Sequence, residues 1–327
     1  MIAIYHSRDL DGIASGRIIK EKYPEATLVG YHYGEDFEIY YDGLVINGVE
    51  YPTTPDTHII MADVSLPMDK MEILFKRFFF RWIDHHASAI KDFEEYFGLK
   101  AKRKKFHHLT EVECDEVFEL GEAVGCHQGL AYLIDGTAGC VITYGALFGE
   151  AIPMGIDLLG DYDVWNQHSG WNEVMNFQYG MRGCNVENFP WESMFMMDKI
   201  EAIKEKGKII LDYQREQDLI AAKSAFEVEF EGYRAIAMNT TRFTSQAFDS
   251  TPGYDLMIPF RFDGKEWSYS LYTTSEIDCS AIAKKYGGGG HKKAAGFKTK
   301  HNIFVRIGSE VISAASDFKV HTKTKAD

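Results

Sequence analysis

The sequence predicts an α/β fold, with a mostly parallel sheet in its N-terminal half and a smaller α/β domain after it. Short apolar runs at residues 2–5, 59–62 and 78–83 are typical of strands that are buried on both faces of a parallel sheet. A long charged helical pattern at residues 191–222 separates them from shorter segments in which apolar and polar residues alternate, as in half-buried strands.

The N-terminal elements can be predicted in order from their apolar spacing and their breakers. Asp9, Asp11 and Gly12 are expected in the loop after the first strand. Residues 34–55 are aromatic, acidic and marked by Gly and Pro, so we expect a loop with a hairpin at 44–49. The other expected elements are strands at 2–5, 27–31, 59–62 and 78–83, helices at 13–20 and 67–77, and a Gly- and Ala-rich helix that begins near 136 and runs to 144.

The sequence pattern changes in the C-terminal half, where short alternating segments replace the apolar runs. This change sets the expected domain boundaries. We expect an N-terminal domain over residues 1–190, a helical linker over 191–222 and a C-terminal domain over 223–327. The glycine run at 287–290 interrupts the last helix. The elements expected in this half are strands at 226–230, 233–238, 256–260 and 267–272, and a helix at 279–286.

Composition excludes several classes of protein. The net charge of −14 argues against a protein that coats long nucleic acid, which needs a broad basic face. Five scattered cysteines without a CxxC pattern argue against a disulfide framework or a structural zinc site. There is no leader pattern and no apolar run of membrane-spanning length, so we expect a cytoplasmic protein without a membrane partner. Residues 100–105 carry five cations, either as a solvated loop or as a surface that gathers an anionic substrate.

Acidic and histidine side chains follow the ends of these apolar segments. Because ligands bind beyond the carboxyl ends of strands in open α/β sheets, these side chains should gather at one edge. Each cluster alone is weak evidence, but gathered carboxylates would repel one another without a cation. Oxygen and imidazole ligands suit manganese, and their number allows two ions. The candidates are His6, Asp9, Asp11, Asp63, Asp84, His85, His86, and either Asp161 or Asp163.

The glycine run is a second candidate site. Four glycines at 287–290 can form a flexible connection, but His291 and two lysines follow them directly, which is unusual for a linker. Glycines allow backbone N–H groups to approach an anion closely. His291 could hydrogen-bond a phosphate or a nucleobase, and we therefore favour a substrate contact.

The order of these motifs resembles the DHH/DHHA1 phosphoesterase superfamily, and the likeness covers most of the chain. Within that superfamily the chain is similar to the short, two-domain members, namely nanoRNase-type oligoribonucleases and exopolyphosphatase-related proteins. It is too short to resemble the RecJ exonucleases, which carry added domains. The motifs that carry the resemblance are His6-x-x-Asp9-x-Asp11-Gly12, Asp63, Asp84-His85-His86, an Asp at 161–163, and Gly288-Gly289-Gly290-His291.

The resemblance implies roles for these residues and an active site in the cleft between the two domains. His86 would face the substrate phosphate and Asp84 would orient a neighbouring imidazole. Asp163 is preferred to Asp161 as the fourth motif because Val164 and Trp165 follow it. The implied ligands are His6, Asp9 and Asp63 for one manganese ion, and Asp11, Asp63, His85 and Asp163 for the second. The implied substrate contacts are His86, Gly288, Gly289, Gly290 and His291.

The function that the resemblance implies is manganese-dependent hydrolysis of short oligoribonucleotides or linear dinucleotides to mononucleotides. Magnesium or cobalt could replace manganese. The alternatives are a phosphatase for a 3′-phosphorylated nucleotide, or a hydrolase for polyphosphate or a cyclic dinucleotide. An inactive nucleotide-binding regulator is the least favoured interpretation. We expect no long duplex nucleic acid as a partner, and either a monomer or a homodimer.

Overall fold

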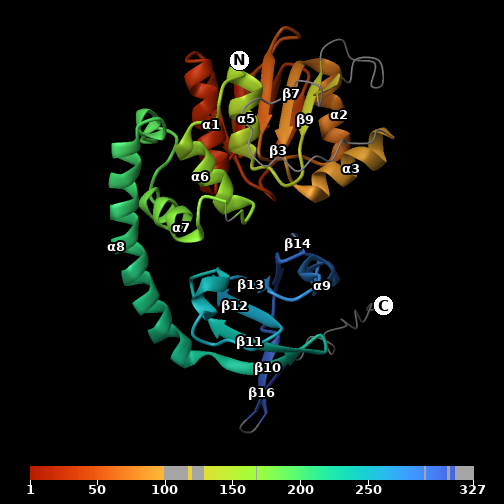
Figure 1. Cartoon of the computed structure of the whole chain (residues 1–327). Helices are drawn as coiled ribbons and strands as arrows, with labels where there is room; N and C mark the ends of the chain where they lie inside the picture. The colour runs from red at the N-terminus through yellow and green to blue at the C-terminus, as the bar shows by residue number, and fades with distance from the viewer. Residues whose placement is uncertain (99–116, 120–128, 167, 291, 308–309, 314–327) are drawn as a thin grey trace, which may run out of the picture. The chain divides into compact units, whose positions relative to one another are not determined.

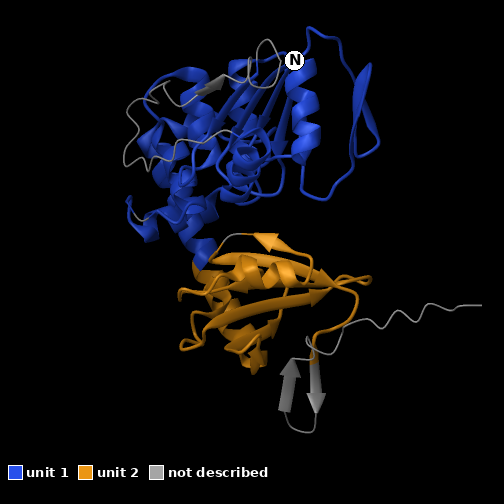
Figure 2. Cartoon of the chain, turned by 90° about the vertical axis from the view of Figure 1, so that its right-hand side faces the viewer, with its two compact units in different colours: residues 1–211 blue, residues 212–327 orange. Residues whose placement is uncertain are grey.

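The computed structural model describes residues 1–98, 117–119, 129–166, 168–290, 292–307 and 310–313. The chain divides into two compact units, Met1–Leu211 and Asp212–Asp327 (Figure 2). Each unit has its own sheet and its own hydrophobic core. Among the described residues, no helix combines the length and the apolar character that crossing a membrane requires.

The first unit is built on a six-stranded sheet with the strand order β2-β1-β6-β7-β9-β8. All neighbouring strands run parallel except β8 and β9, which are antiparallel. The predicted α/β fold with a mostly parallel sheet is therefore confirmed. The strands are β1 (Ile2–His6), β2 (Thr27–Tyr31), β6 (His58–Ala62), β7 (Phe79–Asp84), β8 (Val117–Glu119) and β9 (Leu130–Leu133).

Helices cover both faces of this sheet (Figure 1). On one face, Ile18 belongs to the same core as Ala3 and Ile60. On the other face, Leu74 packs in a core with Ile4. Successive residues of each strand thus pack alternately into the two cores, which explains why the strand sequences are continuously apolar. The helices of the first face are α1 (Leu10–Lys22), α5 (Gly139–Phe148), α6 (Met154–Asp163) and α7 (Trp171–Gly180); those of the second are α2 (Met68–Arg77) and α3 (Ala87–Phe97).

The sheet changes its winding direction between β1 and β6. From β1 the chain passes through α1 on one face to β2; it returns on the other side of β1 as β6, which α2 follows on the opposite face. Connections that leave neighbouring strands toward opposite faces open a crevice at the carboxyl ends of those strands. His6 ends β1, and Asp63 directly follows β6. The fold therefore places both residues at this switch point.

Two predicted segments in the first unit differ from the structure. The α1 helix begins at Leu10, because the side chain of Asp9 accepts the backbone N–H of Gly12 at 2.9 Å and caps the helix. Asp11 therefore lies in the first helical turn and not in a loop. Residues 34–55 contain the predicted hairpin, but as part of a three-stranded antiparallel sheet of β3 (Phe37–Tyr40), β4 (Gly43–Ile46) and β5 (Val49–Pro52).

The second unit has a six-stranded sheet in the order β10-β11-β12-β13-β15-β14, antiparallel except between β11 and β12. Part of the predicted glycine loop pairs with β15 as the short strand β14. The remaining elements are the 3-10 turns Trp191–Met194, Ala222–Ser224 and Ser245–Phe248, helices α8 (Met197–Ala221) and α9 (Cys279–Lys285), and strands β10 (Phe226–Phe230), β11 (Tyr233–Asn239), β12 (Leu256–Phe262), β13 (Trp267–Tyr272), β14 (Gly289–Gly290), β15 (Ala294–Thr299), β16 (Phe304–Ile307) and β17 (Glu310–Ser313).

Candidate metal centre

His85 lies at the centre of one group of carboxylates. Its Nε2 atom is 3.1 Å from Oδ1 of Asp63, 3.5 Å from Oδ2 of Asp11 and 3.4 Å from Oδ2 of Asp163. These side chains come from the end of β7, the loop after β6, the first turn of α1 and the last residue of α6. Asp11, His85 and Asp163 could together hold one metal ion.

His6 forms a second group, which shares Asp63 with the first. The Nδ1 atom of His6 lies 2.8 Å from Oδ2 of Asp9 and 3.8 Å from Oδ2 of Asp63. Oδ1 of Asp63 faces His85, whereas Oδ2 faces His6. His6, Asp9 and Asp63 could hold a second ion. A single carboxylate thus connects two sets of ligands, one on each oxygen.

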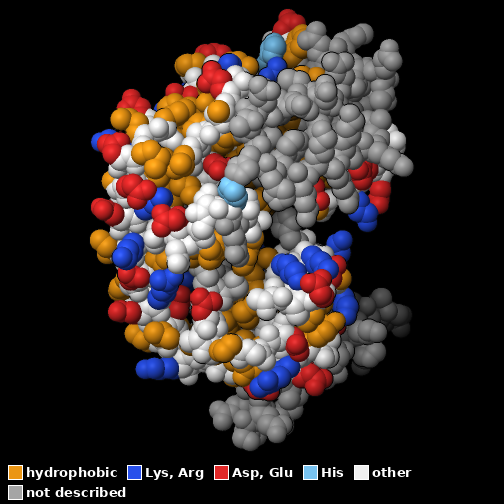
Figure 3. Space-filling view, viewed as in Figure 1, with side chains coloured by type: hydrophobic (Ala, Val, Ile, Leu, Met, Phe, Trp, Pro, Cys, Tyr) orange, Lys and Arg blue, Asp and Glu red, His pale blue; other side chains and the backbone are white. Residues whose placement is uncertain are grey.

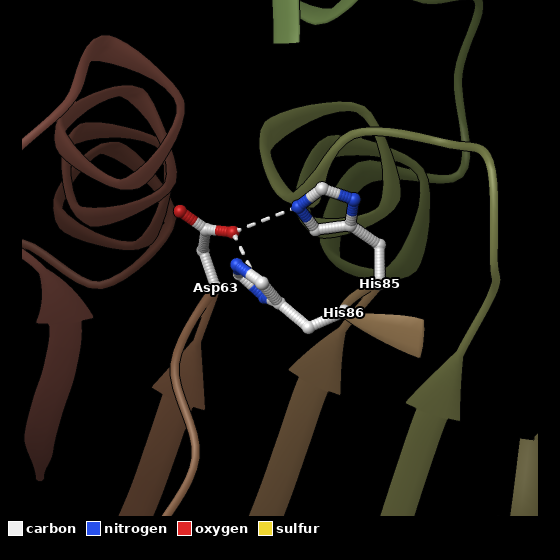
Figure 4. Close-up of side chains that lie close together, drawn as sticks. All are labelled: Asp63, His85 and His86. Atoms are coloured by element: carbon white, nitrogen blue, oxygen red, sulfur yellow. Dashed lines mark hydrogen bonds and ion pairs between the residues drawn. The ribbon is translucent and has the colours of Figure 1, made fainter. Parts of the chain in front are cut away.

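The backbone holds Asp63 in an unusual conformation. Its φ angle is +60°, a region that residues other than glycine rarely adopt and that is common at functional sites. Its N–H group donates to the carbonyl of Ile83 at 2.8 Å, and its side chain is buried. Figure 4 shows the result, with the imidazoles of His85 and His86 both directed toward the Asp63 carboxylate.

Asp84 orients His86. Oδ1 of Asp84 lies 2.7 Å from Nδ1 of His86, and it also accepts the backbone N–H groups of His85 at 2.7 Å and of His86 at 3.1 Å. Burial lowers the pKa of His86, but the charge of Asp84 and this hydrogen bond outweigh burial and raise the pKa to about 9. The His86 ring is therefore positively charged at neutral pH.

The N-terminus of α5 binds Asp11, a contact that the sequence analysis did not anticipate. The backbone N–H groups of Gly139 and Cys140 donate to the two oxygens of Asp11 at 2.8 and 2.7 Å. Helix N-termini stabilise anions because their first N–H groups lack partners within the helix. The Gly- and Ala-rich start of this helix was the available signal, since small residues permit such a close approach.

The two candidates for the fourth motif have different surroundings. Asp161 is buried, and its carboxylate accepts the side chains of Asn166 and Ser169, both at 2.8 Å. Asp163 instead faces His85. Burial, followed by the charge of Asp11, raises the pKa of Asp163 to about 7. This geometry favours Asp163 as a ligand, whereas the Asp161 carboxylate, within α6, holds the loop that follows the helix.

The donor set fits a divalent cation. Burial and the charges of Asp11 and Asp9 raise the pKa of Asp63 well above its ordinary value, because these carboxylates repel one another in a site with little water. A divalent cation would remove that repulsion, and a mixture of carboxylate and imidazole ligands suits manganese, zinc or iron better than calcium. The ligand atoms within each group lie no more than 4.8 Å apart.

Two residues that the sequence analysis did not single out line the same centre. Nδ1 of His32 lies 3.1 Å from Nε2 of His6. The ring centroid of Tyr33 lies 5.8 Å from that of His6 and 6.0 Å from that of His86. Both residues follow the predicted strand at 27–31, so the rule that ligands gather at strand ends could have found them.

The predicted substrate contacts of the glycine run belong to the second unit. A Cβ atom on Gly288 would overlap the carbonyl oxygen of Gly296, and Gly290 has a φ of +137°. These two glycines are therefore required by the packing of the run against β15. His291 and the basic run at 100–105 lie outside the described residues. The cleft between domains stays a prediction.

Comparison with known proteins gives distant structural similarities. No family model matches the chain, and no curated protein does. Similar solved structures include the pGpG-specific phosphodiesterase PggH from Vibrio cholerae, with 12% identity over 91% of this chain and 93% of that one and a TM-score of 0.35. An exopolyphosphatase-related protein from Bacteroides fragilis has 12% identity over 92% and 87% of the chains, with a TM-score of 0.41. RecJ from Thermus thermophilus, in complex with Mn²⁺, has 11% identity over 90% of this chain and 49% of its own, with a TM-score of 0.39.

Similarities with TM-scores below 0.5 say nothing of what this chain binds or hydrolyses. Those properties have to be inferred from the side chains of the candidate centre.

Proposed function

We propose that this protein is a metal-dependent phosphodiesterase that hydrolyses short oligoribonucleotides or linear dinucleotides to mononucleotides. The observation that carries the proposal is the position of Asp63, whose two carboxylate oxygens face different imidazoles, His6 and His85. A carboxylate in that position can bridge two ions. Two ions separated by a single bridging ligand are typical of enzymes that cleave phosphoesters.

The proposed ligands are those of the two groups described above, with manganese as the preferred metal. When bound, the ions would supply an activated water and would neutralise charge on the phosphoryl oxygens. His86 would donate a hydrogen bond to a phosphoryl oxygen, since its ring is charged at neutral pH and Asp84 fixes its orientation. The amides of Gly139 and Cys140 would hold the Asp11 carboxylate in place.

The charge of the chain supports a short substrate. The net charge is −14, and in the view of Figure 3 the Lys and Arg side chains of the described residues are interspersed with acidic ones. Because acidic residues are in excess, phosphates far from the metal centre would gain little net attraction, and long nucleic acid would gain little affinity from them. Gly288, Gly289, Gly290 and His291 are the proposed contacts for the rest of a short substrate.

Two other functions remain as alternatives. A phosphatase acting on a 3′-phosphorylated nucleotide, or a hydrolase of polyphosphate or a cyclic dinucleotide, would use the same ions and His86. An inactive nucleotide-binding regulator is disfavoured, because it would not need buried carboxylates whose mutual repulsion raises the pKa of Asp63.

The test is a substrate panel with the full-length protein and manganese. The panel holds a linear dinucleotide, a five-residue RNA, a 3′-phosphorylated nucleotide, polyphosphate and a cyclic dinucleotide, and mass spectrometry identifies the products. Asp63→Asn is the inactive control, because asparagine tolerates the positive φ of this position but removes the bridging charge. Release of mononucleotides from the dinucleotide and the RNA supports the proposal. Hydrolysis of the 3′-phosphorylated nucleotide, polyphosphate or the cyclic dinucleotide, without cleavage of the linear dinucleotide and the RNA, contradicts it.

A further inference from the structure

The imidazole of His6 has a different neighbour at each of its two nitrogens. Nδ1 faces the carboxylates of Asp9 and Asp63, at 2.8 and 3.8 Å. Nε2 lies 3.1 Å from Nδ1 of His32, and the centroids of the two rings are 5.3 Å apart. A cation shared with Asp9 and Asp63 would therefore be bound through Nδ1 of His6, while Nε2 is engaged by His32.

The backbone fixes His32 independently of His6. In the parallel pairing of β1 with β2, His6 is opposite Tyr31, so His32 is the next residue beyond this pair. The N–H group of His32 donates to the Glu35 carboxylate at 2.9 Å, and the N–H group of Glu35 donates back to the His32 carbonyl at 3.1 Å. Asn47 also donates to Glu35, at 2.9 Å. The turn after β2 thus holds His32 at the edge of the centre.

We propose that His32 is a positioning residue, which keeps the proton of His6 on Nε2 and so leaves the lone pair of Nδ1 for a divalent cation. A neutral imidazole carries one proton, and the nitrogen that binds a metal carries none. If Nδ1 of His6 is the ligand, the proton has to lie on Nε2, where Nδ1 of His32 is the acceptor within reach. Histidine ligands commonly donate their other N–H group to such an acceptor, which fixes the orientation of the ring.

This inference rests on the proposed function, because it assumes that His6 binds a metal. It adds a residue that none of the sequence motifs contains. It also makes a distinction between the two ions. His32 contacts His6, whereas His85 contacts Asp11, Asp63 and Asp163. Loss of the acceptor at His32 should therefore weaken the binding of one ion, the one held by His6, and not that of the other.

Three substitutions of His32 distinguish its role as a hydrogen-bond acceptor from its role in packing. His32→Asn can place an amide oxygen near the position of Nδ1, His32→Gln moves that oxygen one carbon further away, and His32→Leu removes it. Manganese affinity of the metal-free, full-length protein is measured by titration calorimetry. We expect one of two affinities to fall about 10- to 100-fold in the Leu and Gln variants, the cost typical of losing such a partner, and to recover largely in His32→Asn.

The matched control is His58→Leu. His58 is the exposed first residue of β6, at the opposite end of that strand from Asp63, and its ring stacks on Phe79 at a centroid distance of 4.7 Å. This variant should bind both ions with the affinities of the wild type. Thermal unfolding without metal shows whether each variant is folded.

The possible results are distinct. Wild-type affinities in His32→Leu, or an Asn variant no better than the Leu variant, would overturn the role of His32 and leave the proposed function intact. If His32→Leu does not fold, the manganese affinities of His32→Asn and His32→Gln are compared instead, and equal affinities would overturn the role of His32. Absence of manganese binding by the wild type would overturn both the proposed function and this inference.

Discussion

Gly139 leaves no room for a methyl group beside Asp63. A Cβ atom on Gly139 would lie 2.8 Å from both Cβ and Oδ1 of Asp63, closer than side-chain atoms pack. The N–H group of the same glycine donates to Asp11 at 2.8 Å. The first residue of α5 therefore contacts two of the proposed ligands, and only glycine allows the helix to approach both.

Gly139→Ala should weaken manganese binding about 10- to 100-fold, because the added methyl group displaces the carboxylate that both ions would share. The measurement is a manganese titration of metal-free protein. Gly160→Ala is the control: its Cβ would crowd Val141 at 2.6 Å within the packing of α6 on α5, without touching a proposed ligand. It should lower the unfolding temperature but keep the affinity. A wild-type manganese affinity in Gly139→Ala would show that the close approach of this residue to Asp63 is not needed.

The fold of the first unit followed largely from apolar runs. Strands at 2–5 and 59–62 were predicted because a parallel strand buried on both faces has a continuous apolar sequence. The three-stranded sheet within 34–55 was only partly predicted. Its strands are short and alternate, and Phe37, Leu44 and Ile46 are buried in the core of the unit by tertiary packing that local pattern does not reveal.

The candidate centre was predicted from strand ends, and its omissions have a clear cause. His6, Asp63 and His85 follow apolar runs, so the switch-point rule brings them together. The amides of Gly139 and Cys140 were missed because the small residues at the start of α5 indicate a close approach but do not say which side chain the backbone donors bind. His32 was missed because a single histidine after a strand is not distinctive until the register of β1 with β2 is known.

Asp161 and Asp163 should respond differently to the same substitution. Asp163→Asn should lower metal occupancy, since it removes a charge that faces His85. Asp161→Asn should keep both ions but destabilise the fold by about 1–3 kcal/mol, because one of the Asn166 and Ser169 donors loses its carboxylate oxygen acceptor. Metal content by mass spectrometry and chemical unfolding separate the two effects. Loss of metal from Asp161→Asn alone would show that the fourth motif is misplaced.

The stability of the metal-free protein should fall as the pH rises toward 7. The pKa of Asp163 is about 7 in the fold, against 3.8 in an unfolded chain, so the folded state binds the extra proton. Stability from this group is fully present below about pH 4, is lost as the pH rises through about 7, and is constant above that. The unfolding temperature of the wild type minus that of Asp163→Asn should therefore decrease from pH 5 to pH 7.

At pH 8, manganese should raise the unfolding temperature of the wild type more than that of Asp163→Asn. Binding to the folded state raises the unfolding temperature of the wild type, and Asp163→Asn should gain less because it lacks a ligand. Apparent affinity should also weaken below pH 7, since a carboxylic acid has to lose its proton before it can bind. A temperature difference that is independent of pH between 5 and 8 would contradict a raised pKa at Asp163.

His86→Ala should reduce turnover about 10²- to 10³-fold and leave metal content unchanged, the cost expected for losing one donor to the transition state. His86 could instead join Asp63 and His85 as a ligand, since these three residues form a further group that could hold an ion. Loss of an ion from His86→Ala would establish that second role.

Substrate length provides the last prediction. The protein has a net charge of −14, so it should repel the part of a long RNA that extends beyond the metal centre. Each added phosphate contributes affinity only where it meets a cation. A dinucleotide should therefore be hydrolysed much faster than a 24-residue RNA at equal concentration in manganese. Raising the salt concentration should narrow the difference, since screening weakens the repulsion of the longer chain. Equal rates at low salt would contradict a local binding site and would indicate a processive exonuclease.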